Sequence, residues 1–300
     1  MDQRTTPASP SLAATSSCPV CGTPATPMFR AHDFDILGCG DCLHQFVALA
    51  VSRDHVSTTY DDAYFSGGGA GYADYLAEEA LLQRSGRQYA MLLARHLRVG
   101  RLLDVGSAAG FVLAGFVDRG WRGTGLEPNA RMAEHARSVL SLDVRTTTLE
   151  EFDTTSEEPF DVVSMIQVIA HFHNLRTAMD QARALTRPGG HWLIETWDNQ
   201  SWTARLLGRH WHEYSPPSVL HIFSRASLVR LAADYGMTPV AFGRPRKRIS
   251  GAHVKSLLAY KFGDDVVGRL ERQAIRAVPD RMILPYPAED LFWVLLRRDR

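Results

Sequence analysis

From residue 101 onward, short apolar runs alternate with segments in which apolar residues recur at a helical spacing. Five of the runs are predicted to be strands, at 101–105, 121–127, 143–147, 160–166 and 191–196. The segments between them predict helices at 110–120, 128–140 and 174–186. Such alternation is typical of a parallel sheet with helices on both faces. We therefore predict an α/β fold with a doubly wound, mostly parallel sheet.

A glycine-bearing turn, Gly106 to Gly110, follows the first predicted strand. Ligands of doubly wound sheets bind beyond the carboxyl ends of the strands, where this turn, Glu127 and residues 167–171 would meet. A carboxylate at the position of Glu127 can accept both hydroxyls of an adenosine ribose. The turn has only two glycines, and the acidic Asp104 precedes it, which disfavours a pyrophosphate. S-adenosylmethionine, which carries positive charges, therefore suits this turn better than a dinucleotide does.

Four cysteines, Cys18, Cys21, Cys39 and Cys42, form two Cys-x-x-Cys pairs separated by 17 residues. This spacing is typical of a zinc ribbon, in which two tight turns present four thiolates to one tetrahedral ion. Four thiolates leave no open position for water, so the predicted zinc is structural. Two disulfides or a metal-free redox pair are the alternatives, and a reducing cytosol disfavours the disulfides.

The overall charge is balanced, with 33 Lys plus Arg and 33 Asp plus Glu. A clustered basic footprint is the usual sign of nucleic-acid binding, and none is evident in the ribbon. No apolar run approaches the roughly 18 residues of a membrane span, and the N-terminus lacks the pattern of a secretory signal. We therefore expect a cytoplasmic protein with neither a nucleic-acid nor a membrane partner; the sequence does not indicate an oligomeric state.

Four stretches in this order, "LLDVGSAAGFVL", "GTGLEPN", "FDVVSMIQVIAHF" and "LTRPGGHWLIET", resemble the successive motifs of class I S-adenosylmethionine-dependent methyltransferases. Together with "CPVC", "CGDC", "YDDAYF", "GYADY" and "HIFSRASLVRLAADYGM", they resemble a subgroup with an N-terminal zinc ribbon, related to sugar C-methyltransferases and small-molecule O-methyltransferases. The resemblance implies a seven-stranded Rossmann-like sheet, closed by a strand at 290–298 antiparallel to 238–242. It also implies methyl transfer from S-adenosylmethionine to a small molecule.

The resemblance further implies which residues hold the cofactor. Asp104, Gly106, Ser107 and Gly110 would line its methionine part, and Glu127 would bind the ribose. The remaining implied cofactor contacts are Pro128, Thr148, Leu149, Gln167, Val168 and Tyr72. The family's middle glycine is Ala108 here, which is a small change.

Two histidines, His171 and His221, are candidates for contacting the acceptor or removing its proton, because the pKa of histidine suits proton transfer near neutrality. His171 follows the fourth predicted strand, but it lacks the acidic neighbour that the family often has, since Ala170 precedes it. His221 follows Leu220, whereas the sugar C-methyltransferases carry a Glu-His pair there. Either histidine could instead be a packed structural residue. The acceptor would be a sugar-bearing or biosynthetic intermediate, methylated on oxygen or carbon.

The chain is predicted to divide into a disordered tail at 1–16, a zinc ribbon at 17–57, a linker or lid with a helix at 58–98, and a methyltransferase domain at 99–300. Aromatic-rich and basic stretches near 197–223 and 244–289 suggest insertions that cap the substrate. Two other function classes stay open. One is a ribbon-based interaction protein with a vestigial adenosine site, and the other is a nicotinamide oxidoreductase, which the turn disfavours.

Overall fold

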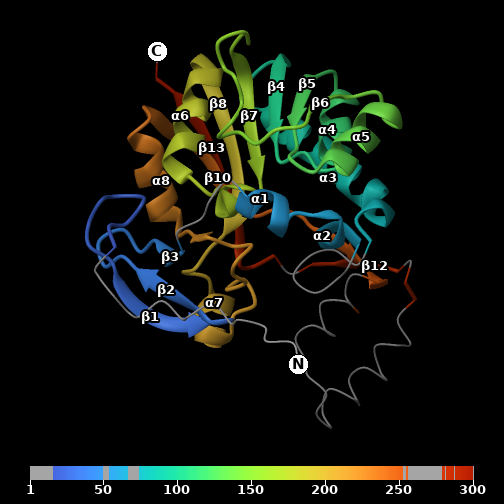
Figure 1. Ribbon diagram of the computed structural model, residues 1–300. Coiled ribbons are helices and arrows are strands. Elements are labelled where there is room, and N and C mark those ends of the chain that lie inside the picture. Colours follow the sequence, from blue (N-terminus) through green and yellow to red (C-terminus); the bar gives the residue numbers. More distant parts are fainter. Residues whose placement is uncertain are drawn as a thin grey trace.

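A seven-stranded sheet in the order β10-β13-β8-β7-β4-β5-β6 forms the centre of the computed structural model (Figure 1). The structure describes residues 16–49, 54–66, 74–252, 255, 279–280, 282–286 and 288–299. The parallel strands are β4 (Arg101–Val105), β5 (Arg122–Leu126), β6 (Asp143–Arg145), β7 (Phe160–Ile166) and β8 (Thr186–Trp197). Strand β13 (Leu291–Arg298) runs antiparallel between β8 and β10 (Met237–Gly243). The predicted α/β fold and its antiparallel closing strand are thus confirmed.

The strand positions follow the sequence pattern closely, with one difference at β8. This strand begins at Thr186, five residues before the predicted start, because the chain passes from helix α6 directly into the sheet. The register against β7 is irregular between Phe160 and Val162, next to this early start. The "RPGG" stretch therefore ends the helix as predicted, and it also belongs to the strand.

Helices cover both faces of the sheet (Figure 1). On one face lie α3 (Glu79–Leu93), α4 (Phe111–Val117) and α5 (Ala130–Ser138), which share an apolar cluster with inward side chains of β4, β7, β8 and β13. On the other lie α6 (Leu175–Leu185) and α8 (Arg225–Ala233), packed in a second cluster. The buried residues of α6 recur at three- and four-residue spacing, so a single apolar stripe faces the sheet.

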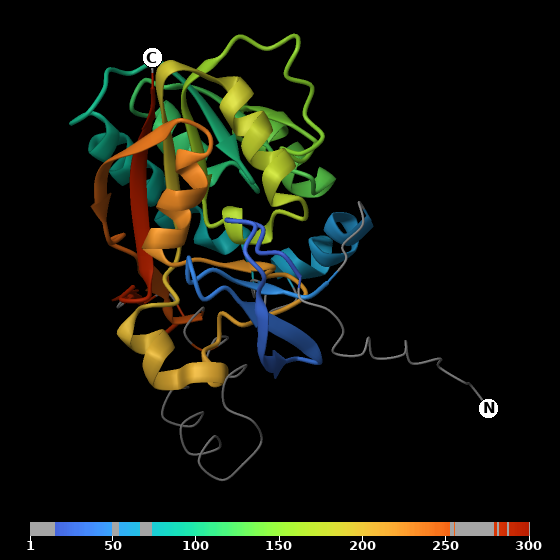
Figure 2. The ribbon, with the colours of Figure 1, turned by 90° about the vertical axis from the view of Figure 1, so that its left-hand side faces the viewer.

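The cysteine-rich segment forms a small antiparallel sheet with β1 (Thr26–Ala31), β2 (Phe34–Gly38) and β3 (Gln45–Val47). Its fourth strand is β9 (His221–Ile222), which follows β8 much later in the sequence and pairs with β3. Apolar side chains of this unit belong to the same cluster as α6 and α8. Figure 2 shows the resulting contact, with the blue strands against the yellow and orange segments. The ribbon is therefore joined to the main sheet by both pairing and packing.

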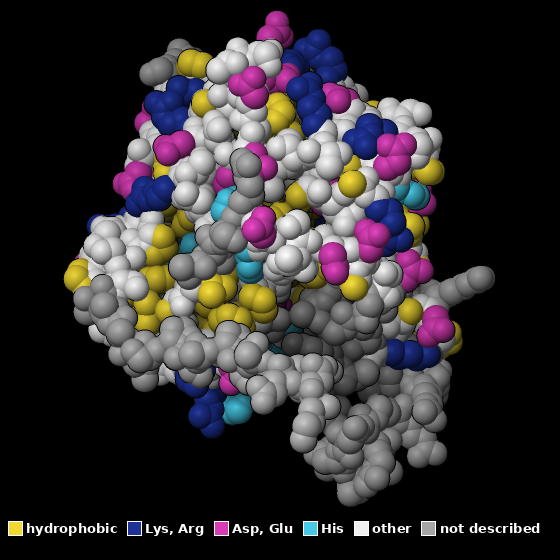
Figure 3. All heavy atoms as spheres, viewed as in Figure 1, with side chains coloured by type: hydrophobic (Ala, Val, Ile, Leu, Met, Phe, Trp, Pro, Cys, Tyr) yellow, Lys and Arg dark blue, Asp and Glu magenta, His cyan; other side chains and the backbone are white. Residues whose placement is uncertain are grey.

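Several short elements complete the described structure. They are α1 (Asp54–Thr59), α2 (Asp62–Ser66), η1 (Leu76–Glu78), η2 (Ile169–His171), α7 (Trp202–Leu207), η3 (Gly208–His210), β11 (Arg248–Ser250) and β12 (Ile283–Pro285). The predicted tail before residue 16 and most of the insertion near 244–289 lie outside the described residues. Among the described helices, none has the length and apolar character needed to cross a bilayer. On the face in Figure 3, basic and acidic side chains are interspersed.

Candidate active site

A cavity of about 370 Å³ lies at the carboxyl ends of β4, β5 and β7. Ten of the site residues predicted from the sequence line it, namely Asp104, Gly106, Ser107, Glu127, Pro128, Thr148, Leu149, Gln167, Val168 and His171. Gly110 and His221 do not belong to its wall, and Tyr72 lies outside the described residues. The crevice predicted at the strand ends is thus present, and it is large enough for a small-molecule ligand.

The turn between β4 and α4 requires glycine at both of its ends. Gly106 has a φ of +67°, and a Cβ atom there would lie 2.7 Å from Cγ2 of Val168. Gly110 has a φ of +80°, and its Cβ would lie 2.9 Å from Cβ of Ala136 in α5. Gly106 therefore shapes the cavity wall, whereas Gly110 allows α4 to pack closely on its neighbour. Ala108 takes a φ of +47° between them and lines the cavity.

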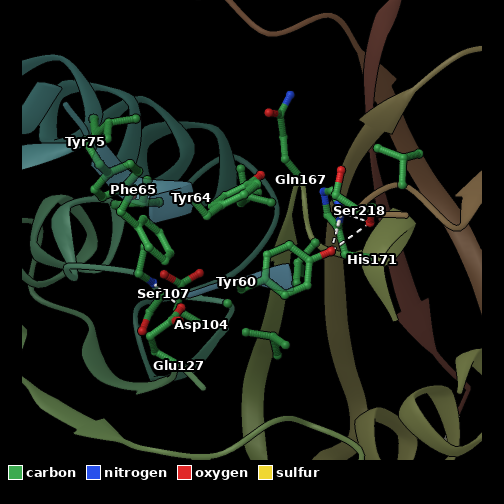
Figure 4. Close-up of a pocket in the computed structure, with 18 of the residues that line it drawn as sticks. Tyr60, Tyr64, Phe65, Tyr75, Asp104, Ser107, Glu127, Gln167, His171 and Ser218 are labelled. Carbon is green, nitrogen blue, oxygen red and sulfur yellow. Dashed lines mark hydrogen bonds between the residues drawn. The ribbon is translucent and has the colours of Figure 1, made fainter. Parts of the chain in front are cut away.

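Two buried carboxylates flank this turn (Figure 4). Glu127 accepts hydrogen bonds from the backbone N–H groups of Ala108 and Asn129, both at 2.8 Å. Asp104 accepts one from the Ser164 hydroxyl at 2.6 Å. Burial raises the pKa of each carboxyl to about 7. Within the described chain neither has an ion pair with Lys or Arg, so this half of the cavity suits a cationic ligand.

Two hydroxyl groups beside these carboxylates have no partner. Ser107 Oγ and Thr148 Oγ1 are both buried, and neither forms a hydrogen bond with the described residues. Both residues line the cavity, next to the turn and to the end of β6. Buried polar groups normally have partners, so a ligand with hydroxyl and amine groups would complete these bonds. The residues present therefore fit the adenosine and methionine parts of S-adenosylmethionine.

The other half of the cavity centres on His171, in the short helix η2 after β7. Its Nδ1 atom lies 2.7 Å from the carbonyl oxygen of Ser218 and 3.0 Å from the hydroxyl of Tyr60. The Tyr60 hydroxyl also donates to the Ser218 carbonyl, at 2.7 Å. Figure 4 shows these three groups converging opposite Asp104 and Glu127.

These contacts select one tautomer of His171. The Ser218 carbonyl can only accept, so Nδ1 carries a proton when it bonds to this oxygen. Nε2 of the neutral ring is then unprotonated, and it makes no hydrogen bond within the described structure. Burial lowers the pKa of His171, which keeps the ring neutral at pH 7. Nε2 is thus available to accept a proton.

His221 lies elsewhere, in β9. Its Nδ1 atom is 3.3 Å from Nε2 of His44, and its Nε2 atom is 3.1 Å from the carbonyl oxygen of Phe172. The ring is buried and stacks near His44 and Phe223. Both ring nitrogens are therefore used in packing the ribbon sheet against the chain after β7. This geometry favours the structural alternative for His221 over contact with an acceptor.

Sequence reasoning did not single out several residues in the half of the cavity that centres on His171. Tyr60 and Tyr64, from the aromatic segment predicted as a linker or lid, line the cavity, as do Trp197 and Ser218. The aromatic richness of residues 58–76 was the available signal for Tyr60. Trp197 and Ser218 lie in the stretch near 197–223 that was predicted to cap the substrate. Ser218 contributes a backbone carbonyl, which every residue has, so its residue type carried no signal.

The four cysteines form one cluster in the ribbon. Their sulfur atoms all lie within 4.8 Å of one another, with 3.6 Å between Cys18 and Cys42 and 3.4 Å between Cys21 and Cys39. None is in a disulfide. Tetrahedral zinc with Zn–S bonds of about 2.3 Å places sulfur atoms about 3.8 Å apart, close to these values. The cluster therefore fits a zinc ion with four thiolate ligands.

Comparison with known proteins connects the cavity to one family. Residues 74–241 match the family model described as a methyltransferase domain. A ubiquinone biosynthesis O-methyltransferase of Nitrobacter winogradskyi is 32% identical over 113 residues, which make up 36% of this chain and 42% of that protein. One of Alkalilimnicola ehrlichii is 26% identical over 180 residues, 54% of this chain and 73% of that protein. The chain thus spans less than half the length of the first of these relatives.

A solved structure agrees with the fold. Burkholderia thailandensis 1,6-didemethyltoxoflavin-N1-methyltransferase, solved with 1,6-didemethyltoxoflavin and S-adenosylhomocysteine, aligns with a TM-score of 0.51 and 17% identity, over 91% of this chain and 99% of that chain. This likeness shows the Rossmann-like methyltransferase fold. Because the family model covers more than half of the 300 residues, the chain belongs to the methyltransferase-domain family.

Proposed function

We propose that this protein transfers a methyl group from S-adenosylmethionine to a small-molecule acceptor. The observation that carries the proposal is a single cavity with two different halves. One half holds two buried carboxylates that have no cationic partner among the described residues, and the other holds a neutral histidine whose Nε2 forms no hydrogen bond with them. A cationic methyl donor suits the first half, and an acceptor that loses a proton suits the second.

The cofactor supplies an electrophilic methyl group on a sulfonium that is already a good leaving group. We infer that Glu127 binds the ribose hydroxyls, that Thr148 and Leu149 flank the adenine, and that Asp104 and the Gly106 turn hold the methionine part. The unpartnered hydroxyls of Ser107 and Thr148 support this assignment, as does the negative charge that Asp104 and Glu127 acquire above their pKa values. Much of the catalysis then consists of placing the acceptor in line with the methyl group.

His171 acts as the general base in this proposal. The acceptor's oxygen would bond to the methyl carbon as the carbon–sulfur bond breaks and S-adenosylhomocysteine leaves. The acceptor's proton would pass to Nε2 of His171, so the ring becomes an imidazolium with both nitrogens protonated. Nδ1 keeps its proton and donates it to the Ser218 carbonyl oxygen, and the contact with Tyr60 keeps the ring in place. An unprotonated base in this position favours a hydroxyl acceptor. The relatives named as ubiquinone biosynthesis O-methyltransferases support methylation on oxygen of a biosynthetic intermediate.

The cysteine cluster is proposed to bind one structural zinc ion. Cys18, Cys21, Cys39 and Cys42 would complete its coordination, which leaves no position for a substrate or a water molecule. Such an ion stabilises a unit that is too small to fold on hydrophobic burial alone. Its proposed role is to hold the ribbon against α6, α8 and β9.

Calorimetry with purified protein tests the cofactor assignment. We expect micromolar-scale binding of S-adenosylmethionine and no binding of a nicotinamide dinucleotide. Labelled S-adenosylmethionine offered with a panel of phenolic and sugar hydroxyl compounds then tests transfer. Binding of the dinucleotide alone would favour an oxidoreductase. Binding of neither would favour an interaction protein with a vestigial site.

A further inference from the structure

Asn129 joins two parts of the molecule that are distant in sequence. It lies between β5 and α5, is buried, and makes four hydrogen bonds besides the one that its carbonyl oxygen accepts from Ala133 N in the first turn of α5. Its backbone N–H donates to Glu127 Oε1 at 2.8 Å, and its Oδ1 accepts from Met132 N at 2.9 Å, which caps α5. Its Nδ2 donates to the carbonyl oxygen of Tyr60 at 3.1 Å and to Asp62 Oδ1 at 3.2 Å.

The two bonds from Nδ2 reach the segment 54–66, which comprises α1 and α2. We call this segment the strap. Four of its side chains, Val56, Tyr60, Tyr64 and Phe65, line the cavity opposite the glycine turn. The strap therefore forms one wall of the cavity, and Tyr60 within it touches His171. Among the residues that the structure describes, Asn129 is the one that bonds both to Glu127 in the cofactor half and to the strap.

A ligand on Glu127 would favour this arrangement. Each oxygen of the carboxylate already accepts one backbone N–H, from Ala108 and from Asn129, so the group has one orientation. A ribose bound to the remaining lone pairs stabilises that orientation, and with it the backbone of Asn129. The same backbone places the side-chain amide that holds the Tyr60 carbonyl. Coupling of this kind is reciprocal, so docking of the strap also strengthens cofactor binding.

We propose that Asn129 is a positioning residue that couples the cofactor half of the cavity to its acceptor half, by holding the strap, and with it Tyr60, beside the ribose-binding carboxylate. The proposal rests on the proposed function, because it takes Glu127 as the ribose ligand. It predicts that the acceptor half is completed when the cofactor is bound, so that cofactor binding precedes productive binding of the acceptor.

Hydrogen exchange with and without S-adenosylhomocysteine tests this coupling in the full-length protein. In the wild type, we expect saturating S-adenosylhomocysteine to slow amide exchange in 54–66 at least tenfold. Asn129→Asp keeps the Oδ1 cap on Met132 and the backbone bond to Glu127, but it replaces the amide donor with a carboxylate oxygen, which repels Asp62. In this variant we expect less than threefold slowing in 54–66 and about fivefold weaker binding of S-adenosylhomocysteine.

Two further variants make the result decisive. Asp62→Ala removes one acceptor of the amide from an exposed part of the strap without touching the cap, and it should give an intermediate loss of protection. Arg131→Gln removes an exposed ion pair to the same Asp62 and should leave the protection unchanged. Exchange in α8, none of whose residues line the cavity, serves as an internal reference that none of these changes should alter.

The outcomes separate the two proposals. If calorimetry shows no binding of S-adenosylhomocysteine to the wild type, the proposed function fails and the coupling with it. If the wild type binds the ligand but Asn129→Asp and Asp62→Ala retain full protection of 54–66, the coupling alone is overturned. Should Asn129→Asp unfold, Asp62→Ala still decides between these results.

Discussion

At the scale of single residues, Asp104 illustrates a conflict between stability and ligand binding. Burial raises its pKa to about 7, whereas an unfolded chain releases this proton near pH 4. Between these values the folded state binds more protons, so the free energy of unfolding falls as the pH rises from about 4 to 7. Asp104→Asn has no charge to desolvate and can still accept the Ser164 bond. We expect it to raise the free energy of unfolding of the cofactor-free protein at pH 8 by about 2 kcal/mol, measured by chemical denaturation.

The same substitution should weaken binding of S-adenosylmethionine at pH 8 at least tenfold, about 1.4 kcal/mol, because the attracting charge is gone. At pH 6 the wild-type carboxyl is largely protonated, so the difference between the two proteins should shrink. Glu158→Gln, at a highly exposed carboxylate, is the control and should change neither quantity. Equal affinities of Asp104→Asn and wild type at pH 8 would contradict the role given to Asp104.

His171 permits a second prediction at this scale. Loss of a general base typically costs a factor of 10² to 10⁴ in rate. With an acceptor from the labelled-methyl screen, we expect His171→Asn to lower the transfer rate at least a hundredfold while S-adenosylhomocysteine affinity stays within twofold. Because burial lowers the pKa of His171, the wild-type rate at saturating cofactor should be constant above pH 7 and fall only in more acidic solution. His96→Asn, at an exposed site on the protein surface, should behave as wild type.

At the scale of elements, Arg176 connects helix α6 to the ribbon. Its guanidinium donates to the carbonyl oxygens of Pro19, at 2.8 Å, and of Val20. These carbonyls lie between the first two cysteines, so the bonds dock the metal cluster on the helix. We expect Arg176→Met to lower the free energy of unfolding by at least about 3 kcal/mol, since each of the two hydrogen bonds to a charged donor contributes about 1.5–3 kcal/mol. Thermal and chemical denaturation measure this change.

Asp234→Ala is the matched control for that variant. It removes only the exposed ion pair with Arg176, at 2.8 Å, which contributes less than about 0.5 kcal/mol. An equal loss in both variants would show that the ion pair, rather than the contact with the ribbon, stabilises the helix.

The elements also show how far a sequence predicts this fold. The runs at 101–105 and 160–166 are strands because their apolar residues are contiguous and buried on both faces, a local property. Strand β9 is only two residues long, and it pairs with a ribbon strand 175 positions away, at Phe46 and His221. No local pattern encodes that partner. His221 was consequently a candidate for the acceptor site, although its ring nitrogens contact His44 in the ribbon and the carbonyl of Phe172.

The residues of the candidate site likewise divide into those that the sequence predicts and those that it does not. Asp104 and Gly106 lie at the carboxyl end of β4, and Glu127 follows the neighbouring parallel strand β5, so topology alone brought them together. Tyr60 reaches His171, 111 residues further along the chain, only because the strap packs across the strand ends. The sequence showed an aromatic-rich segment, but which ring faces the cavity depends on contacts such as the bond from Asn129 to Tyr60.

At the scale of the whole molecule, the proposed zinc ion is linked to the acceptor half of the cavity through the backbone. Val47 in the ribbon donates to the carbonyl of Leu220 at 3.0 Å, and Leu220 donates to the carbonyl of Ala170 at 2.9 Å. Ala170 and Leu220 are close in sequence to His171 and Ser218, whose contact selects the His171 tautomer. The carboxylates of the cofactor half lie on β4 and after β5, away from this path. Removal of the metal should therefore affect the two halves unequally.

We expect chelation of zinc, or Cys39→Ser, to lower the transfer rate at least tenfold while S-adenosylhomocysteine affinity stays within about threefold. Elemental analysis before and after chelation establishes the metal content, and re-addition of zinc to the chelated protein should restore the rate. Cofactor affinity that falls as steeply as the rate would mean that the ribbon supports the entire sheet. Full activity of a metal-free protein would instead mean that the ribbon's apolar contacts with α6 and α8 hold Ser218 in place without the ion.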